Sequence, residues 1–175
     1  ALNPNRQPHD LSVDLFKAIS DWHHLAILEL TYLRGFRFEA DYIAKKLGIS
    51  RNEAGLAMER LVRLELVEKN RTGKYQKAQS RLLVESNIPN TALKNFHRQV
   101  LEKAIESIDA QAPRERMSAT DILPIDSKYL PEVKRLAEEF SSAVMALSEK
   151  SVNKDQVYAL AMHFFNLTPT PDTRN

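Results

Sequence analysis

The sequence ADYIAKKLGISRNEAGLAMERLVRLELVEKNRTGKYQKA, residues 40–78, holds the clearest indications of local structure in this chain. Its first nine residues have the apolar spacing of a short helix, which ends at Gly48, a residue type that commonly terminates helices. Ser50 and Glu53 then form an S-x-x-E capping box, in which each side chain satisfies a backbone amide of the other residue. The pattern predicts a second helix over about 51–64, with an apolar face made of Ala54, Ala57, Leu61 and Leu64.

A β-hairpin is predicted directly after this helix. Residues 66–70 and 75–78 have strand character, and the sequence RTGK at 71–74 joins them as a turn. Short helix, glycine turn, capped helix and hairpin follow one another in the order of a winged helix-turn-helix. Together with a preceding amphipathic helix over about 13–33, this module is expected to span residues 13–80.

The second half of the chain, residues 88–168, is predicted to form a small α+β domain for effector binding or dimerisation. The expected elements are a helix over 91–110, a strand over 117–124, a helix over 129–147 capped by Ser127, and a strand over 155–168. In the last segment, both sets of alternating positions carry apolar side chains, so we expect a strand that is buried on both faces.

The fold class that results is α+β and helix-rich: a winged helix-turn-helix followed by a small α+β domain. The termini, residues 1–12 and 169–175, are polar and proline-containing, and we expect both to be flexible. The polar lead-in also leads us to expect that the chain is a fragment with a further segment upstream.

Composition excludes several classes of protein. Cysteine is absent, so disulfides and thiolate metal sites are impossible. No apolar run is long enough to span a bilayer and the start has no signal-peptide pattern, so we expect a cytoplasmic protein without membrane contact. The formal net charge of +2 does not exclude DNA as a partner, because regulators often concentrate positive charge locally.

Several blocks of the sequence together resemble a known family. They are SDWHHLAILEL (20–30), ADYIAKKLGIS (40–50), MERLVRLELVEK (58–69), IPNTALKNFHRQVLEKA (88–104) and DQVYALAMHFFNLT (155–168). They are similar to an uncharacterised family of bacterial proteins that carry a domain of unknown function, known mainly from predatory and cellulose-degrading bacteria. The resemblance covers nearly the whole chain and implies a winged-helix transcriptional regulator, usually with a further helix-turn-helix upstream. It implies no catalytic residue and no ligand.

Candidate DNA contacts lie at the start of the capped helix. Ser50, Arg51 and Asn52 stand where a helix entering the major groove approaches bases and phosphates. Arginine pairs well with guanine and asparagine with adenine. Glu53 and Glu59 oppose this interpretation, because they bring negative charge toward the phosphates.

The hairpin supplies a second group of candidate DNA contacts. The chain holds no acidic residue after Glu68 until residue 85, while Lys69, Arg71, Lys74 and Lys77 fall in or next to the hairpin. In one interpretation these residues lie along the phosphate backbone of double-stranded DNA. In the other they are a solvated edge whose lysines discourage strand pairing.

No catalytic, cofactor or metal motif is present. The sequence has no GxSxG, P-loop or Rossmann pattern, and its histidines lack the spacing of metal ligands, so we predict no enzyme, no cofactor and no metal site. The function indicated is transcriptional regulation, by direct DNA binding or by supporting an upstream DNA-binding segment. The alternative is a protein-interaction or ligand-sensing module that uses the winged-helix fold without nucleic acid. A homodimer and an unidentified small-molecule or protein effector remain open as partners.

Overall fold

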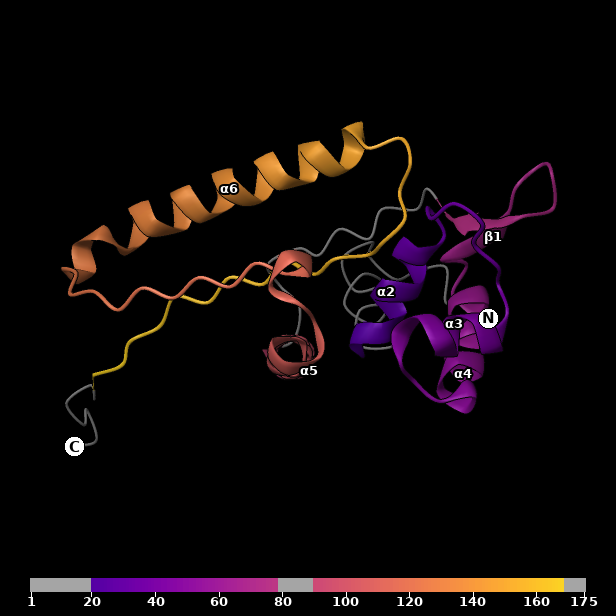
Figure 1. Cartoon of the computed structure of the whole chain (residues 1–175), viewed down its shortest axis with the longest axis horizontal. Coiled ribbons are helices and arrows are strands. Elements are labelled where there is room, and N and C mark those ends of the chain that lie inside the picture. Colours follow the sequence, from indigo (N-terminus) through magenta and orange to yellow (C-terminus); the bar gives the residue numbers. More distant parts are fainter. Residues whose placement is uncertain (1–19, 79–89, 169–175) are drawn as a thin grey trace, which may run out of the picture. The chain divides into compact units, whose positions relative to one another are not determined.

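The computed structural model describes residues 20–78 and 90–168 (Figure 1). The expected flexible termini, and the part of the first predicted helix before residue 20, lie outside this range. Contacts divide the described chain into two units, one made of residues 20–118 and 151–158 and the other of residues 119–150 and 159–168. The domain boundaries predicted from the sequence, 13–80 and 88–168, stay a prediction.

The first unit begins with three helices and a hairpin (Figure 1). Val67 lies opposite Lys77 in the antiparallel hairpin, and Lys69 lies opposite Tyr75. These elements confirm the predicted short helix, the capped helix and the hairpin, and they confirm the helix-rich α+β class. Their bounds are α2 (Trp22–Leu30), α3 (Ala40–Leu47), α4 (Arg51–Arg63), β1 (Val67–Lys69) and β2 (Tyr75–Lys77).

Local sequence explains where α3 ends and α4 begins. Gly48 adopts a left-handed conformation with φ of 66°, which glycine reaches without the steric cost that a side chain would add. The Ile49 amide donates back to the Ala44 carbonyl at 3.2 Å, so a carbonyl at the helix end is satisfied. Two residues later the capping box opens α4, which fixes a short connection between the two helices.

A single apolar core lies between α2, α3, α4 and the hairpin. Its largest fully buried side chains are Ile27, Leu28, Ile43, Leu61, Leu66 and His24. Full burial of each aliphatic side chain contributes about 1.5–3 kcal/mol. A distant segment joins this core: Val157 packs against it, and the Arg34 amide donates to the Lys154 carbonyl at 3.1 Å.

The helix predicted over 13–33 was wrong in its continuity through residue 21 and in its end, while its predicted start lies outside the described residues. Asp21 has an extended backbone with ψ of 133°, so α2 starts at Trp22, and it ends at Leu30 rather than Leu33. Gln99 of α5 (Asn90–Ala110) accounts for the start. Its side-chain oxygen accepts from the Trp22 amide at 3.0 Å and its amide nitrogen donates to Asp21 Oδ1 at 2.9 Å. The helix start is therefore capped by a residue of another helix.

The two long helices of the second half form as predicted. After α5 come two short 3-10 turns, η1 (Pro113–Glu115) and η2 (Ser127–Tyr129), and then α6 (Leu130–Lys150). The predicted cap Ser127 is wrong, because Ser127 is the first residue of η2, and η2 is itself capped by Asp126, whose side chain accepts from the Lys128 amide at 3.0 Å. None of the helices in the described ranges combines the length and the apolar character needed to cross a membrane.

The strands predicted over 117–124 and 155–168 were wrong. Within the described ranges the sheet consists of β1 and β2, and neither of these segments pairs with another strand. The apolar side chains of 155–168 are largely exposed, for example Tyr158 at 75% and Phe165 at 71%. Alternating apolar residues need a paired neighbour to make a buried strand, and the described part of the chain supplies none here.

Candidate nucleic-acid interface

The start of α4 is held by reciprocal hydrogen bonds. The Glu53 amide donates to Ser50 Oγ at 3.1 Å, and the Ser50 amide donates to Glu53 Oε2 at 2.9 Å. Hydrogen bonding to the Glu53 carboxylate, from the Ser50 side chain and then from the Ser50 backbone amide, lowers the pKa of Glu53, so its carboxylate stays ionised at neutral pH. Ser50 thus has a structural role at this helix terminus, and the ionised Glu53 carboxylate, 2.9 Å from the Ser50 amide, brings a negative charge to the place that a phosphate would approach.

Arg51 and Asn52, the two other candidates on α4, are both exposed. Arg51 Nε lies 3.0 Å from Asp41 Oδ1 of α3, in an ion pair whose two side chains are 76% and 75% exposed. Exposed ion pairs are worth little, roughly 0–1 kcal/mol, so this one does not prevent Arg51 from turning to another anion. Asp41 was not among the residues that the sequence pattern indicated.

The solvent face of α4 also carries a basic residue that the sequence analysis missed. Ala54, Ala57 and Leu61 are buried, so positions half a turn away face solvent. Asn52, Glu59 and Arg63 are exposed on that side, at spacings of seven and eleven residues from the first. The same helical spacing that predicted the buried face could have identified Arg63.

The hairpin register separates its side chains into two sets. Lys69, Tyr75 and Lys77 share the side of the buried Val67, and Glu68 lies on the other side, where Gln76 donates to it at 3.0 Å. The Lys77 ammonium lies 2.6 Å from Glu29 of α2, and the Lys69 ammonium lies 5.1 Å from the ring centre of Tyr75. These two lysines are therefore engaged with the protein itself.

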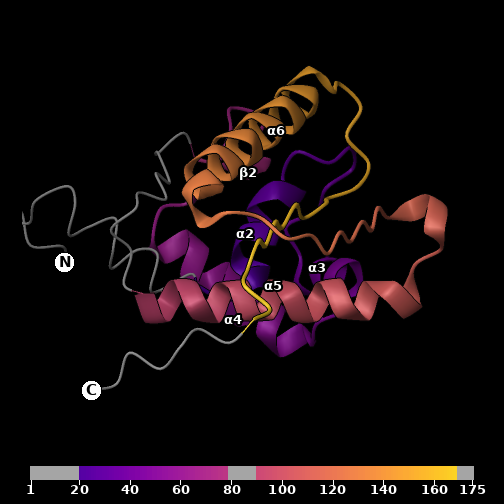
Figure 2. The ribbon, with the colours of Figure 1, turned by 90° about the vertical axis from the view of Figure 1, so that its left-hand side faces the viewer.

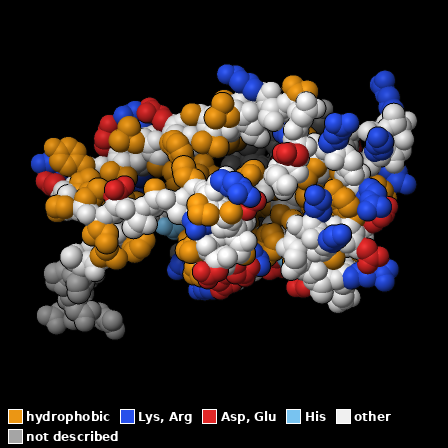
Figure 3. Space-filling view, in the orientation of Figure 1, with side chains coloured by type: hydrophobic (Ala, Val, Ile, Leu, Met, Phe, Trp, Pro, Cys, Tyr) orange, Lys and Arg blue, Asp and Glu red, His pale blue; other side chains and the backbone are white. Residues whose placement is uncertain are grey.

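The hairpin tip presents the remaining basic side chains, Arg71 and Lys74, which are exposed. Asn70 shapes the tip, because its Oδ1 accepts from the amides of Thr72 and Lys74, each at 3.0 Å, and from the Thr72 hydroxyl at 2.7 Å. Gly73 completes the turn with φ of 77°. The face drawn in Figure 3 shows Lys and Arg side chains spread over this unit, with acidic side chains among them.

The predicted residues thus fall into two groups on neighbouring elements. Ser50, Arg51 and Asn52 are consecutive at the start of α4, whereas Lys69, Arg71, Lys74 and Lys77 belong to the hairpin; α4 and β1 are in contact. Arg71, Lys74 and Asn52 project into solvent, while Lys77 is ion-paired with Glu29.

A second site is a polar cavity of about 480 Å³ between α2, α4 and α5. Figure 2 shows α5 lengthwise and Figure 1 shows it end-on. Lys103 lies over the Trp22 ring at 5.1 Å from its centre and pairs with Glu106 at 2.7 Å. The remaining lining is mostly charged or hydrogen-bonding and includes Asp21, His23, His24, Glu53, Arg60, Gln99 and Glu102.

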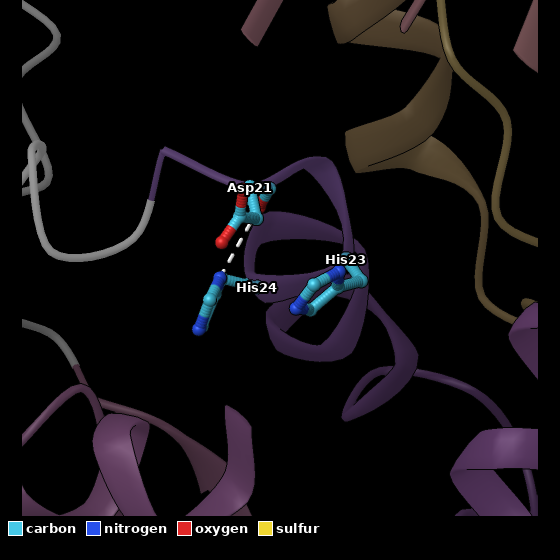
Figure 4. Close-up of side chains that lie close together, drawn as sticks. All are labelled: Asp21, His23 and His24. Atoms are coloured by element: carbon cyan, nitrogen blue, oxygen red, sulfur yellow. Dashed lines mark hydrogen bonds between the residues drawn. The ribbon is translucent and has the colours of Figure 1, made fainter. Parts of the chain in front are cut away.

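Asp21, His23 and His24 converge at one wall of this cavity, close enough for a metal ion to be considered (Figure 4). His24 Nδ1 lies 3.3 Å from the Asp21 carbonyl, and Arg60 lies 3.4 Å from Nε2. A carbonyl only accepts and a guanidinium only donates, so His24 satisfies both as a neutral ring with its proton on Nδ1. Both ring nitrogens are thereby occupied.

Burial, and then the neighbouring His23, lower the pKa of His24 to about 4. Burial also lowers the pKa of His23. A cation here would meet the Arg60 guanidinium and the positive end of the α2 dipole. This geometry favours a structural histidine that joins α2 to α4, and the predicted absence of a metal site stays a prediction.

Fold and site together define a helix-rich α+β protein with an exposed basic hairpin beside an exposed helix face. The chain belongs to the family described as domain of unknown function (DUF4423), which matches residues 3–167. No curated protein and no solved structure matches the chain.

Proposed function

We propose that this chain is a transcriptional regulator, in which residues 20–78 form a winged helix-turn-helix that binds double-stranded DNA in the cytoplasm. In this proposal α3 and α4 are the helix-turn-helix, α4 enters the major groove, and the hairpin is the wing. The observation that carries the proposal is the hairpin tip, where Asn70 holds two exposed basic residues, Arg71 and Lys74, on a defined turn of the hairpin that follows α4.

Charges near α4 set the expected strength of binding. Asp41 pairs with Arg51, and Glu59 shares the solvent face with Asn52. These carboxylates repel phosphates, so most of the favourable electrostatic energy must come from the hairpin. Lys69 and Lys77 are engaged with the protein itself, so Arg71 and Lys74 are the hairpin residues expected to reach DNA. If these two neutralise about two phosphates, the slope of log K against log salt is near −1.8, or roughly one decade of affinity between 50 and 200 mM salt.

The experiment is a titration of fluorescent random duplex DNA at these two salt concentrations. Lys74→Glu is expected to weaken binding about tenfold and to make the salt slope shallower by about 0.9, because one phosphate contact is lost. Lys94→Glu is the matched control, since it makes the same charge change at an exposed position of α5. Absence of binding at low salt, or equal weakening by both variants, contradicts the proposal.

In that event the chain acts without contacting DNA, and two observations favour the alternative roles. Leu56 and Val62 of α4 are 55% and 44% exposed, which is the apolar material of a contact with a protein partner or an upstream DNA-binding segment. The cavity between α2, α4 and α5 has the size of a small-molecule site, and its polar lining suits a charged effector.

A further inference from the structure

Among its described residues, the second half of the chain contains two long helices but no buried side chain. Every buried residue of the described ranges lies between His24 and Val67. Helix α6 spans Leu130–Lys150 and buries no residue at all, and its apolar side chains stand out in Figure 3 along the segment labelled α6 in Figure 1. An amphipathic helix gains most of its stability by packing its apolar face, so α6 requires a surface that covers this face.

The apolar face of α6 has the pattern of a coiled-coil seam. Its positions follow one another at spacings of three, four, three, four and three residues, which is the heptad period. Three of them are exposed large side chains, Leu130 at 42%, Phe140 at 45% and Leu147 at 67%, and the other three are partly but not fully buried. The complete seam is Leu130, Val133, Ala137, Phe140, Val144 and Leu147.

On the opposite face of α6, charged side chains form ion pairs with one another within the helix. Arg135 pairs with Glu132 at 2.7 Å and also with Glu139, one turn away on each side. These three charged residues lie away from the seam and remain exposed. Apart from Leu136 and Met145, which are apolar and exposed beside the seam, the helix has one solvated face and one apolar face, as expected for a helix that pairs with another helix.

Large and small side chains alternate along the seam in such a way that the seam is complementary to a second copy of itself running in the opposite direction. In an antiparallel pair, Ala137 lies against Phe140 of the second copy, and Phe140 lies against the second Ala137. Large side chains then fill the space that small ones leave, which is how well-packed cores are built. A parallel pair would instead place Phe140 against Phe140 and leave a gap at Ala137.

Other positions of the antiparallel pair agree with this match. Val133 lies against Val144, and Leu130 lies against Leu147. On the flank, Lys134 faces Ser141 and not another lysine, so like charges do not meet across the pair. An antiparallel pair of identical helices is related by a two-fold axis, which is the symmetry of most soluble dimers.

We propose that α6 pairs in antiparallel orientation with α6 of a second copy of this chain, and that this pairing makes the protein a homodimer. The proposal does not rest on the proposed DNA binding, whose candidate residues belong to the other unit of the chain. A dimer gives the proposed winged helices the two-fold arrangement that suits palindromic sites, but dimerisation can be measured without DNA.

The test is the solution mass of the chain and of two variants by sedimentation or light scattering. The wild type is expected at twice the chain mass of 20.0 kDa. Phe140→Glu buries a carboxylate at the seam of both copies and is expected to raise the dimer dissociation constant at least roughly a thousandfold. Ser142→Glu places the same residue on the exposed opposite face and keeps the dimer. A monomeric wild type, or a Phe140→Glu variant that remains dimeric, overturns the proposal.

Orientation is tested by cross-linking, which does not depend on a variant that weakens the dimer. The chain has no cysteine, so single cysteines can be introduced without background. A mixture of Val133→Cys and Val144→Cys chains is expected to form a disulfide between the two kinds of chain under oxidising conditions. Val133→Cys alone should not cross-link, because antiparallel pairing separates the two copies of residue 133. Cross-linking of Val133→Cys alone overturns the antiparallel arrangement.

Discussion

Lowering the pH should destabilise the core between α2, α3, α4 and the hairpin, because the buried His24 is neutral in the folded protein. This side chain is 1% exposed, and its folded-state pKa of about 4 lies well below the value of about 6.5 expected in the unfolded chain. The unfolded chain therefore binds the proton more tightly. At pH 7 the ring is neutral in both the folded and the unfolded chain, so its burial causes no loss of stability there. The free energy of unfolding then falls as the pH drops from about 6.5 toward 4.

The size of the effect follows from the shift in pKa. Each pH unit within this window corresponds to about 1.4 kcal/mol, and partial access of water on protonation reduces the total. Between pH 7 and 4.5 we expect His24 to account for about 2 kcal/mol of lost stability. Carboxylates such as Glu53, whose pKa is also lowered, lose stabilisation at acidic pH as well. A comparison of variants is therefore needed to isolate the histidine.

The comparison uses His24→Gln, whose amide can still donate to the Asp21 carbonyl and accept from Arg60 but does not titrate. Urea unfolding is followed by the fluorescence of Trp22, the single tryptophan of the chain, which lies at the start of α2. His24→Gln should lose about 2 kcal/mol less than the wild type between pH 7 and 4.5. The control His97→Gln changes an exposed histidine and should behave like the wild type. Equal losses in the wild type and His24→Gln would refute the reasoning.

Two further variants address the core and the candidate interface. Leu61→Ala removes a fully buried side chain and should lower the free energy of unfolding by about 2–5 kcal/mol, measured by urea unfolding; Leu56→Ala, at a site that is 55% exposed, should lower it by less than about 1 kcal/mol. Asp41→Asn removes the carboxylate that pairs with Arg51 and should strengthen DNA binding severalfold in the titration described above, because one repulsive charge is lost and Arg51 is released. Unchanged or weaker binding by Asp41→Asn would indicate that Arg51 does not face DNA.

Elements with local causes could be predicted from the sequence. Gly48 ends α3 by its own conformation, and Ser50 with Glu53 opens α4 through hydrogen bonds between residues three positions apart. The hairpin likewise has its turn chemistry in Asn70 and Gly73. In each case the determining interaction lies within a few residues, so a pattern in the sequence is sufficient.

Features that depend on distant residues could not be predicted. The start of α2 is determined by Gln99, seventy-seven positions beyond Trp22, and no periodicity indicates that capping interaction. The same holds for the candidate interface, because the ion pair of Lys77 with Glu29 joins elements far apart in the chain. Residues 155–168 show the opposite problem. Their alternation satisfies the local requirement for a strand, but no neighbouring strand completes it in the described structure.

The return of residues 151–158 to the first unit has a consequence for the order of folding. Val157 and the Lys154 carbonyl join a core whose other members lie between residues 24 and 75. Closing a loop of this length costs about 4 kcal/mol of chain entropy, which a few contacts must offset. We therefore expect the helix–hairpin core to form first and this segment to dock late. Because this segment directly follows α6 in the chain, tension on α6 would reach the core first at Lys154 and Val157, and the segment is expected to detach before the core itself opens.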